Sequence, residues 1–144
     1  MKGFVVDASV ALKWLIPEEH SEEAMRLLER FTGQELELHA PRLLRLEVAN
    51  ALTRYVARGV LKAEQMVHGF QILREIELTY HDEDWSLLEE ALEASRRTGL
   101  TVYDGVYVAL AKRLCTVLVT ADRGLVRKVG DEVEVEGIEE LRGG

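Results

Sequence analysis

The chain has 144 residues, the usual size of one domain, so we expect residues 1–144 to form a single domain. No apolar run approaches the roughly 20 residues that cross a bilayer, which excludes an integral membrane protein and predicts a cytoplasmic one. The net charge of −8 argues against a nucleic-acid binder unless bound cations neutralise part of it. The single cysteine, Cys115, excludes an internal disulfide, and we expect its thiol to be buried.

The first half of the chain alternates short apolar runs with longer stretches of helical periodicity. In chain order, it predicts a strand over residues 3–7, a short helix over 11–15 and a helix over 21–31. A strand over residues 36–40 and two helices over 41–58 and 63–76 follow. Pro41 is expected to open the longest of these helices, and Gly59 to follow its last turn.

The second half predicts a strand over residues 78–81 and two helices over 85–97 and 103–114. It then predicts a strand over residues 116–120, a short helix after residue 122 and a last strand over 132–136. The last strand alternates Glu with Val, and we expect its Glu residues to protect an edge of the sheet. Strands that alternate with helices in this way predict an α/β fold with a mainly parallel sheet.

Two aspartates follow predicted strands. Asp7 ends the first strand, and Asp122 lies just after the strand that ends at Thr120. Ligands bind beyond the carboxyl ends of the strands in open parallel sheets, so both aspartates are expected at the functional edge. The alternative, that each aspartate only caps the helix after it, stays open.

Two further acids lie on predicted helices. Glu47 shares a narrow polar stripe with Asn50 and Arg54, which suggests a metal ligand bordered by two substrate contacts. The alternative is a solvated helix face with a Glu47–Arg54 ion pair. Asp104 opens an almost wholly apolar helix, where it either interacts with the helix dipole or binds a metal.

Together these four carboxylates predict a site for Mg²⁺ or Mn²⁺, with one or two ions bound. Hard divalent cations prefer carboxylate oxygens, and converging carboxylates repel one another without a cation. Bound ions would activate water and stabilise the transition state of phosphodiester cleavage.

Four segments, F-V-V-D-A-S-V-A-L-K-W, A-P-R-L-L-R-L-E-V-A-N-A-L, T-V-Y-D-G-V-Y-V-A-L-A and L-V-T-A-D-R-G-L, each contain one of these acids. In sequence and in order they resemble the acidic motifs of PIN-domain proteins, especially VapC-type toxins. The resemblance implies one PIN-like domain built as a three-layer sandwich, with a parallel sheet of four or five strands between helices. It also implies a Mg²⁺- or Mn²⁺-dependent endoribonuclease that acts on RNA.

The residues that match the metal-site acids of the family are Asp7, Glu47, Asp104 and Asp122. Ser9 and Thr120 match hydroxyl positions that bond the acids or the metal-bound water, and Asn50 matches a common polar position. The resemblance further implies a homodimer that a VapB-type antitoxin inhibits. Gly105 stands where the family often has Ala, and we attribute this difference to drift rather than to a close approach of backbone or substrate.

Three alternatives remain open. A phosphatase of the haloacid-dehalogenase kind also uses an Asp after its first strand, but it normally has a second Asp where this chain has Ser9. A PIN-like module could bind partners without catalysis. A PIN-domain nuclease could also act in RNA maturation or decay rather than as a toxin.

Overall fold

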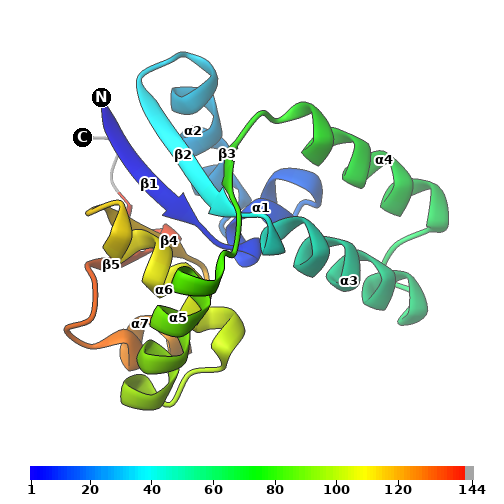
Figure 1. Ribbon diagram of the computed structural model, residues 1–144. Coiled ribbons are helices and arrows are strands. Elements are labelled where there is room, and N and C mark those ends of the chain that lie inside the picture. Colours follow the sequence, from blue (N-terminus) through cyan, green and yellow to red (C-terminus); the bar gives the residue numbers. More distant parts are fainter. Residues whose placement is uncertain (142–144) are drawn as a thin grey trace.

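The computed structural model describes residues 1–141, which form a five-stranded parallel sheet between layers of helices (Figure 1). The strands are β1 (Lys2–Val6), β2 (Leu36–Pro41), β3 (Thr79–His81), β4 (Val117–Thr120) and β5 (Val135–Gly137). The helices are α1 (Ala8–Leu15), α2 (Ser21–Thr32), α3 (Leu43–Ala57), α4 (Ala63–Glu75), α5 (Trp85–Thr98), α6 (Val102–Arg113) and α7 (Arg123–Val129), followed by a 3₁₀ turn at Ile138–Glu140. No helix within these residues is long and apolar enough to span a membrane.

The sheet has the order β3-β2-β1-β4-β5, and its four strand pairings within residues 1–141 are all parallel. β1 is central: Phe4 is in register with Leu38 of β2 on one side and Val117 of β4 on the other. Because helices cover both faces of a parallel sheet, β4 and the second half of β1 are buried apolar runs, whereas β2 also carries Glu37 and His39. The predicted α/β class with a mainly parallel sheet is therefore confirmed.

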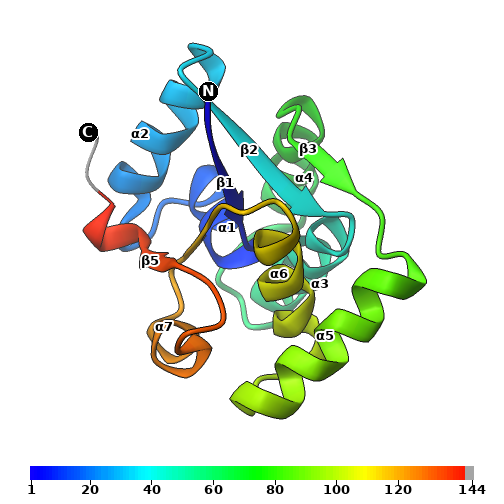
Figure 2. The same ribbon diagram turned by 60° about the vertical axis from the view of Figure 1, so that its left-hand side comes forward.

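The helices form two outer layers. Helices α1 to α4 lie on one face of the sheet, and α5, α6 and α7 lie on the other, with α6 directly against the central strands (Figures 1 and 2). The predicted three-layer sandwich is confirmed. The chain passes from β1 toward β2 in one direction and later from β4 toward β5 in the other, so the strand order reverses between β1 and β4. Open α/β sheets bind ligands in the crevice at this kind of reversal.

Three details differ from expectation. Pro41 ends β2 instead of opening the next helix, because α3 begins only at Leu43. The last strand begins at Val135 rather than at residue 132. The Glu132 carboxylate forms ion pairs with Arg97 at 2.5 Å and with Lys112 at 3.8 Å. Glu132 therefore joins its loop to α5 and α6 instead of protecting an edge of the sheet. Cys115 is exposed in a turn with a φ of 53°, so the expectation of a buried thiol was wrong.

A contact between two helices explains why residue 105 is glycine, so the attribution of this difference to drift was wrong. Helices α5 and α6 pack closely against each other, and a Cβ atom at residue 105 would lie 2.6 Å from the carbonyl oxygen of Ala91. Backbone cannot yield as a flexible side chain can, so only glycine allows the two helices to approach this closely. The contact also places the first turn of α6, which contains Asp104.

We predict that Gly105→Ala lowers the free energy of unfolding by about 1–3 kcal/mol, because the added methyl group forces the two backbones apart. Urea denaturation followed by circular dichroism measures the change. Gly69→Ala is the matched control, since a Cβ there would lie 3.6 Å from the nearest atom, Leu15 Cβ, an ordinary contact. The control should be as stable as the wild-type chain or gain up to about 1 kcal/mol. A Gly105→Ala variant of wild-type stability would contradict this account of the helix contact.

Candidate active site

Asp7 lies at the end of β1 with only 6% of its surface exposed. The Ser9 hydroxyl donates a hydrogen bond to its Oδ1 at 2.6 Å, and the Thr120 hydroxyl donates one to its Oδ2 at 2.5 Å. The backbone N–H of Val10 also donates to Oδ1, at 3.2 Å. Both oxygens of this buried carboxylate are thus bonded, and the bonds link the end of β1 to the end of β4.

Burial raises the pKa of Asp7 to about 6, from an ordinary value of 3.8. The hydrogen bonds from Ser9, Thr120 and Val10 act in the opposite direction, and the nearby Asp104 carboxylate raises the pKa further. Desolvation therefore has a larger effect than the hydrogen bonds, and the charged form of Asp7 is costly in the folded chain.

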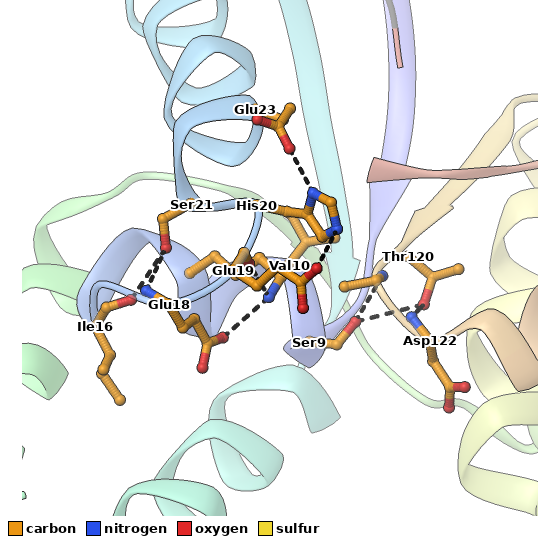
Figure 3. A network of polar contacts seen from close by, with 12 residues as sticks. Ser9, Val10, Ile16, Glu18, Glu19, His20, Ser21, Glu23, Thr120 and Asp122 are labelled. Carbon is orange, nitrogen blue, oxygen red and sulfur yellow. Dashed lines mark hydrogen bonds and ion pairs between the residues drawn. The ribbon is translucent and has the colours of Figure 1, made fainter. Parts of the chain in front are cut away.

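The two hydroxyls also position the turn after β4. Ser9 Oγ accepts a hydrogen bond from the backbone N–H of Ala121 at 2.9 Å, and Thr120 Oγ1 accepts one from that of Asp122 at 3.0 Å. The hydroxyl oxygens lie 3.4 Å apart, and Figure 3 shows Ser9 pointing toward Thr120 and Asp122. Because each hydroxyl bonds Asp7 and this turn together, the backbone of Asp122 is fixed relative to Asp7.

Asp7 and Asp122 both cap helices, as the alternative interpretation proposed. Asp122 Oδ1 accepts from the backbone N–H groups of Gly124 at 2.8 Å and Leu125 at 3.2 Å, at the start of α7. The side chain is exposed, and among residues 1–141 the structure gives its Oδ2 no hydrogen bond or ion pair. Capping therefore uses one oxygen of Asp122 and leaves the other for a ligand.

Glu47 extends from α3 and is partly buried. The hydroxyl of Tyr107, on α6, donates a hydrogen bond to Glu47 Oε1 at 2.6 Å. Burial raises the pKa of Glu47, the Tyr107 bond lowers it, and the carboxylates of Asp104 and Asp7 raise it further. Within residues 1–141 the structure has no ion pair between Glu47 and Arg54, so the solvated-pair alternative is not supported.

Asp104 lies in the first turn of α6, where its backbone N–H donates to the capping hydroxyl of Thr101 at 3.2 Å. Burial raises the pKa of its carboxyl, and the charge of Asp122 raises it further, while Thr101 and Lys128 lower it. Asp104 thus interacts with Asp122, and Asp7 and Glu47 both interact with Asp104.

The structure consequently brings the four predicted acids to one edge of the sheet, where they act on one another electrostatically. Within residues 1–141, no group of three or more Asp, Glu, His or Cys side chains is arranged to hold a metal ion as the side chains now lie. The donors of this group are carboxylate oxygens with neither thiol nor imidazole among them, and three of the four carboxyls have raised pKa values. This set fits a hard divalent cation, whose charge would remove the cost of ionising crowded carboxylates.

The other predicted site residues differ in their placement. Ser9 and Thr120 bond Asp7, whereas the structure gives the exposed Asn50 and Arg54 no hydrogen bond or ion pair with the four acids among the described residues. A substrate role for Asn50 and Arg54 stays a prediction. Sequence reasoning missed Tyr107, although its position one turn after Asp104 in an apolar helix indicates the same helix face.

The chain is similar in sequence to a known protein family. A profile of the PIN domain family matches residues 4–131. The chain is 37% identical to ribonuclease VapC3 of Pyrobaculum aerophilum over 125 residues, which cover 86% of this chain and 92% of that protein.

Solved structures show the same fold. A crystal structure of a Pyrobaculum aerophilum protein superposes with a TM-score of 0.71 at 23% identity, covering 96% of this chain and 92% of the other. A structure of VapBC2 from Rickettsia felis bound to a DNA fragment from its promoter superposes with a TM-score of 0.68 at 14% identity, covering 94% and 98%. The phosphatase alternative is therefore set aside, and the chain belongs to the PIN domain family.

Proposed function

We propose that this protein is a metal-dependent endoribonuclease of the VapC type, in which Asp7, Glu47, Asp104 and Asp122 bind Mg²⁺ or Mn²⁺, as one or two ions. The observation that carries the proposal is the grouping of four carboxylates from four separate segments at the strand reversal, with three of their pKa values raised. A relative that shares 37% of its residues with this chain is named a ribonuclease, which supports RNA as the substrate.

The residues of the chain have separable tasks in this proposal. Asp7 is held on both oxygens, so its carboxylate keeps one orientation in the site. Asp122 and Glu47 each present one oxygen that has no hydrogen bond within residues 1–141. When bound, a divalent cation would supply the acidity that activates water and the positive charge that stabilises the phosphodiester transition state.

Cations near the acids would bind the RNA backbone. Lys128 on α7 is exposed and close enough to Asp104 to lower the pKa of that carboxyl. We propose that Lys128 contacts a substrate phosphate next to the site, and that Asn50 and Arg54 border the substrate from α3. Local positive side chains of this kind offset the overall charge of −8 where the phosphate backbone lies.

We further propose that the chain is the toxin of a toxin–antitoxin pair, forms a homodimer and is inhibited by a VapB-type antitoxin. A structure with the same fold is described as VapBC2, and the 37%-identical relative is named VapC3. The large apolar side chains Leu46, Val67 and Phe70 are exposed on α3 and α4. Exposed apolar surface of this kind is typical of protein-binding sites.

We predict that Asp104→Asn lowers Mn²⁺-dependent cleavage of RNA at least about 100-fold while the chain stays folded, because a carboxylate is lost from the metal site. Fluorescent oligoribonucleotides provide the rate, and circular dichroism verifies the fold. EDTA should abolish the wild-type activity, and added Mn²⁺ should restore it. Asp131→Asn, an exposed aspartate just after α7, is the matched control and should cleave at the wild-type rate. If Asp104→Asn cleaves RNA at the wild-type rate, Asp104 is not part of the metal site. If the unmodified chain never cleaves RNA, the alternative of a binding module without catalysis is favoured.

Induced expression of the wild-type chain in bacteria is expected to arrest growth, and Asp7→Asn or Glu47→Gln should relieve the arrest because each removes a metal-binding charge. Colony counts after induction measure the effect, with immunoblots to show equal protein levels. RNA cleavage by the purified chain without growth arrest would instead indicate a role in RNA maturation or decay.

We predict that Asp7→Asn stabilises the metal-free chain increasingly as the pH rises from 4 to 7. The folded-state pKa of about 6 lies above the ordinary 3.8, so the contribution of Asp7 to stability is present below pH 4 and is lost as the pH rises through 6. Urea denaturation in EDTA should show a stability difference between variant and wild type that grows by on the order of 1–3 kcal/mol over this range. Added Mn²⁺ should stabilise the wild-type chain and not the variant. A difference that stays constant with pH would contradict the raised pKa.

A further inference from the structure

Tyr107 connects the two helical layers at the acidic site. Its side chain is 1% exposed, and its hydroxyl donates a hydrogen bond of 2.6 Å from α6 to the Glu47 carboxylate on α3. These helices lie on opposite faces of the sheet (Figure 2). The bond therefore joins the two layers beyond the carboxyl ends of the strands, where the four acids meet.

Glu47 has fewer hydrogen bonds to hold its carboxylate than Asp7 or Asp122 has. Asp7 accepts three hydrogen bonds and Asp122 accepts two, whereas within residues 1–141 the Tyr107 hydroxyl is the one donor that the structure gives to Glu47. A glutamate side chain also has one more rotatable bond than an aspartate, so its carboxylate loses more conformational freedom when it becomes fixed. Without the Tyr107 hydroxyl, the Glu47 side chain would populate several rotamers.

The bond also leaves the carboxylate usable. It engages Oε1, and Oε2 has no hydrogen bond among the described residues. A phenol is protonated at neutral pH, because its ordinary pKa is about 10. The Tyr107 hydroxyl can therefore act as a lasting donor to one oxygen while the other faces a ligand.

We propose that Tyr107 is a positioning residue of this site, whose hydroxyl orients the Glu47 carboxylate for a divalent cation; the inference rests on the proposed function. Partners that orient a metal ligand in this way set the affinity of the site as well as its geometry. The aromatic ring of Tyr107 fills the core, so Tyr107→Phe keeps the packing and removes only the hydroxyl.

The test is calorimetric titration of the full chain with Mn²⁺ at neutral pH. Tyr107→Phe should weaken binding by about 10- to 100-fold, while Tyr103→Phe, a neighbouring tyrosine on α6 that is 58% exposed, should bind like the wild type. Wild-type affinity in Tyr107→Phe overturns the inference and leaves the proposed function standing. A wild-type chain that binds no Mn²⁺ overturns both.

A double substitution separates positioning from packing. In a Glu47→Gln background, adding Tyr107→Phe should cause no further loss of Mn²⁺ affinity, because the hydroxyl acts through Glu47. A further loss of the same size in that background would indicate that Tyr107 acts on the whole core and would overturn the inference.

The wild-type chain offers a second measurement that needs no folded Tyr107→Phe variant. A buried, bonded hydroxyl proton exchanges slowly with water and gives its own NMR signal. We expect this signal for Tyr107 in the wild type and its loss in Glu47→Ala. A Tyr107 hydroxyl proton that exchanges as fast as that of free tyrosine would overturn the inference.

Discussion

The repulsion among carboxylates at one edge of the sheet is the interaction on which the arrangement of the site depends. Asp7 is buried, with a pKa of about 6; the charge of Asp104 raises the pKa values of Asp7 and Glu47, and the charge of Asp122 raises that of Asp104. Crowded acids of this kind move apart unless the fold holds them together, and when they are held together their pKa values rise. The fold applies that constraint through hydrogen bonds from Ser9, Thr120 and Tyr107 and through the positions of the strand ends.

The parallel sheet provides those positions. Because β1 and β4 are adjacent and run in the same direction, their carboxyl ends are neighbours, and the chain leaves them in opposite directions. Ser9 and Thr120 then bond Asp7 from both sides and also accept backbone N–H groups of the turn that leads to Asp122. One short network thus determines the carboxylate of Asp7 and the backbone position of Asp122.

The two helical layers contribute the other acids by different means. Glycine at residue 105 lets α6 lie directly against α5, which determines where the first turn of α6, and therefore Asp104, is placed. Glu47 comes from the opposite layer and reaches the site through its bond to Tyr107. Functional sites often retain groups that destabilise the fold locally, such as these crowded carboxylates, and packing elsewhere in the protein offsets their cost.

The sequence alone determined the strands that precede Asp7 and Asp122 and the order of the helices between them, because each of these follows from local periodicity. The four acids came from short motifs, and their role as metal ligands stays a prediction. It did not predict the Tyr107–Glu47 bond, the need for glycine beside Ala91, the pairing of Glu132 with Arg97 or the exposure of Cys115. The bond and the Glu132 pairing join residues 60 and 35 positions apart. Only the tertiary structure decided these features, since helix packing and not local pattern brings such residues into contact.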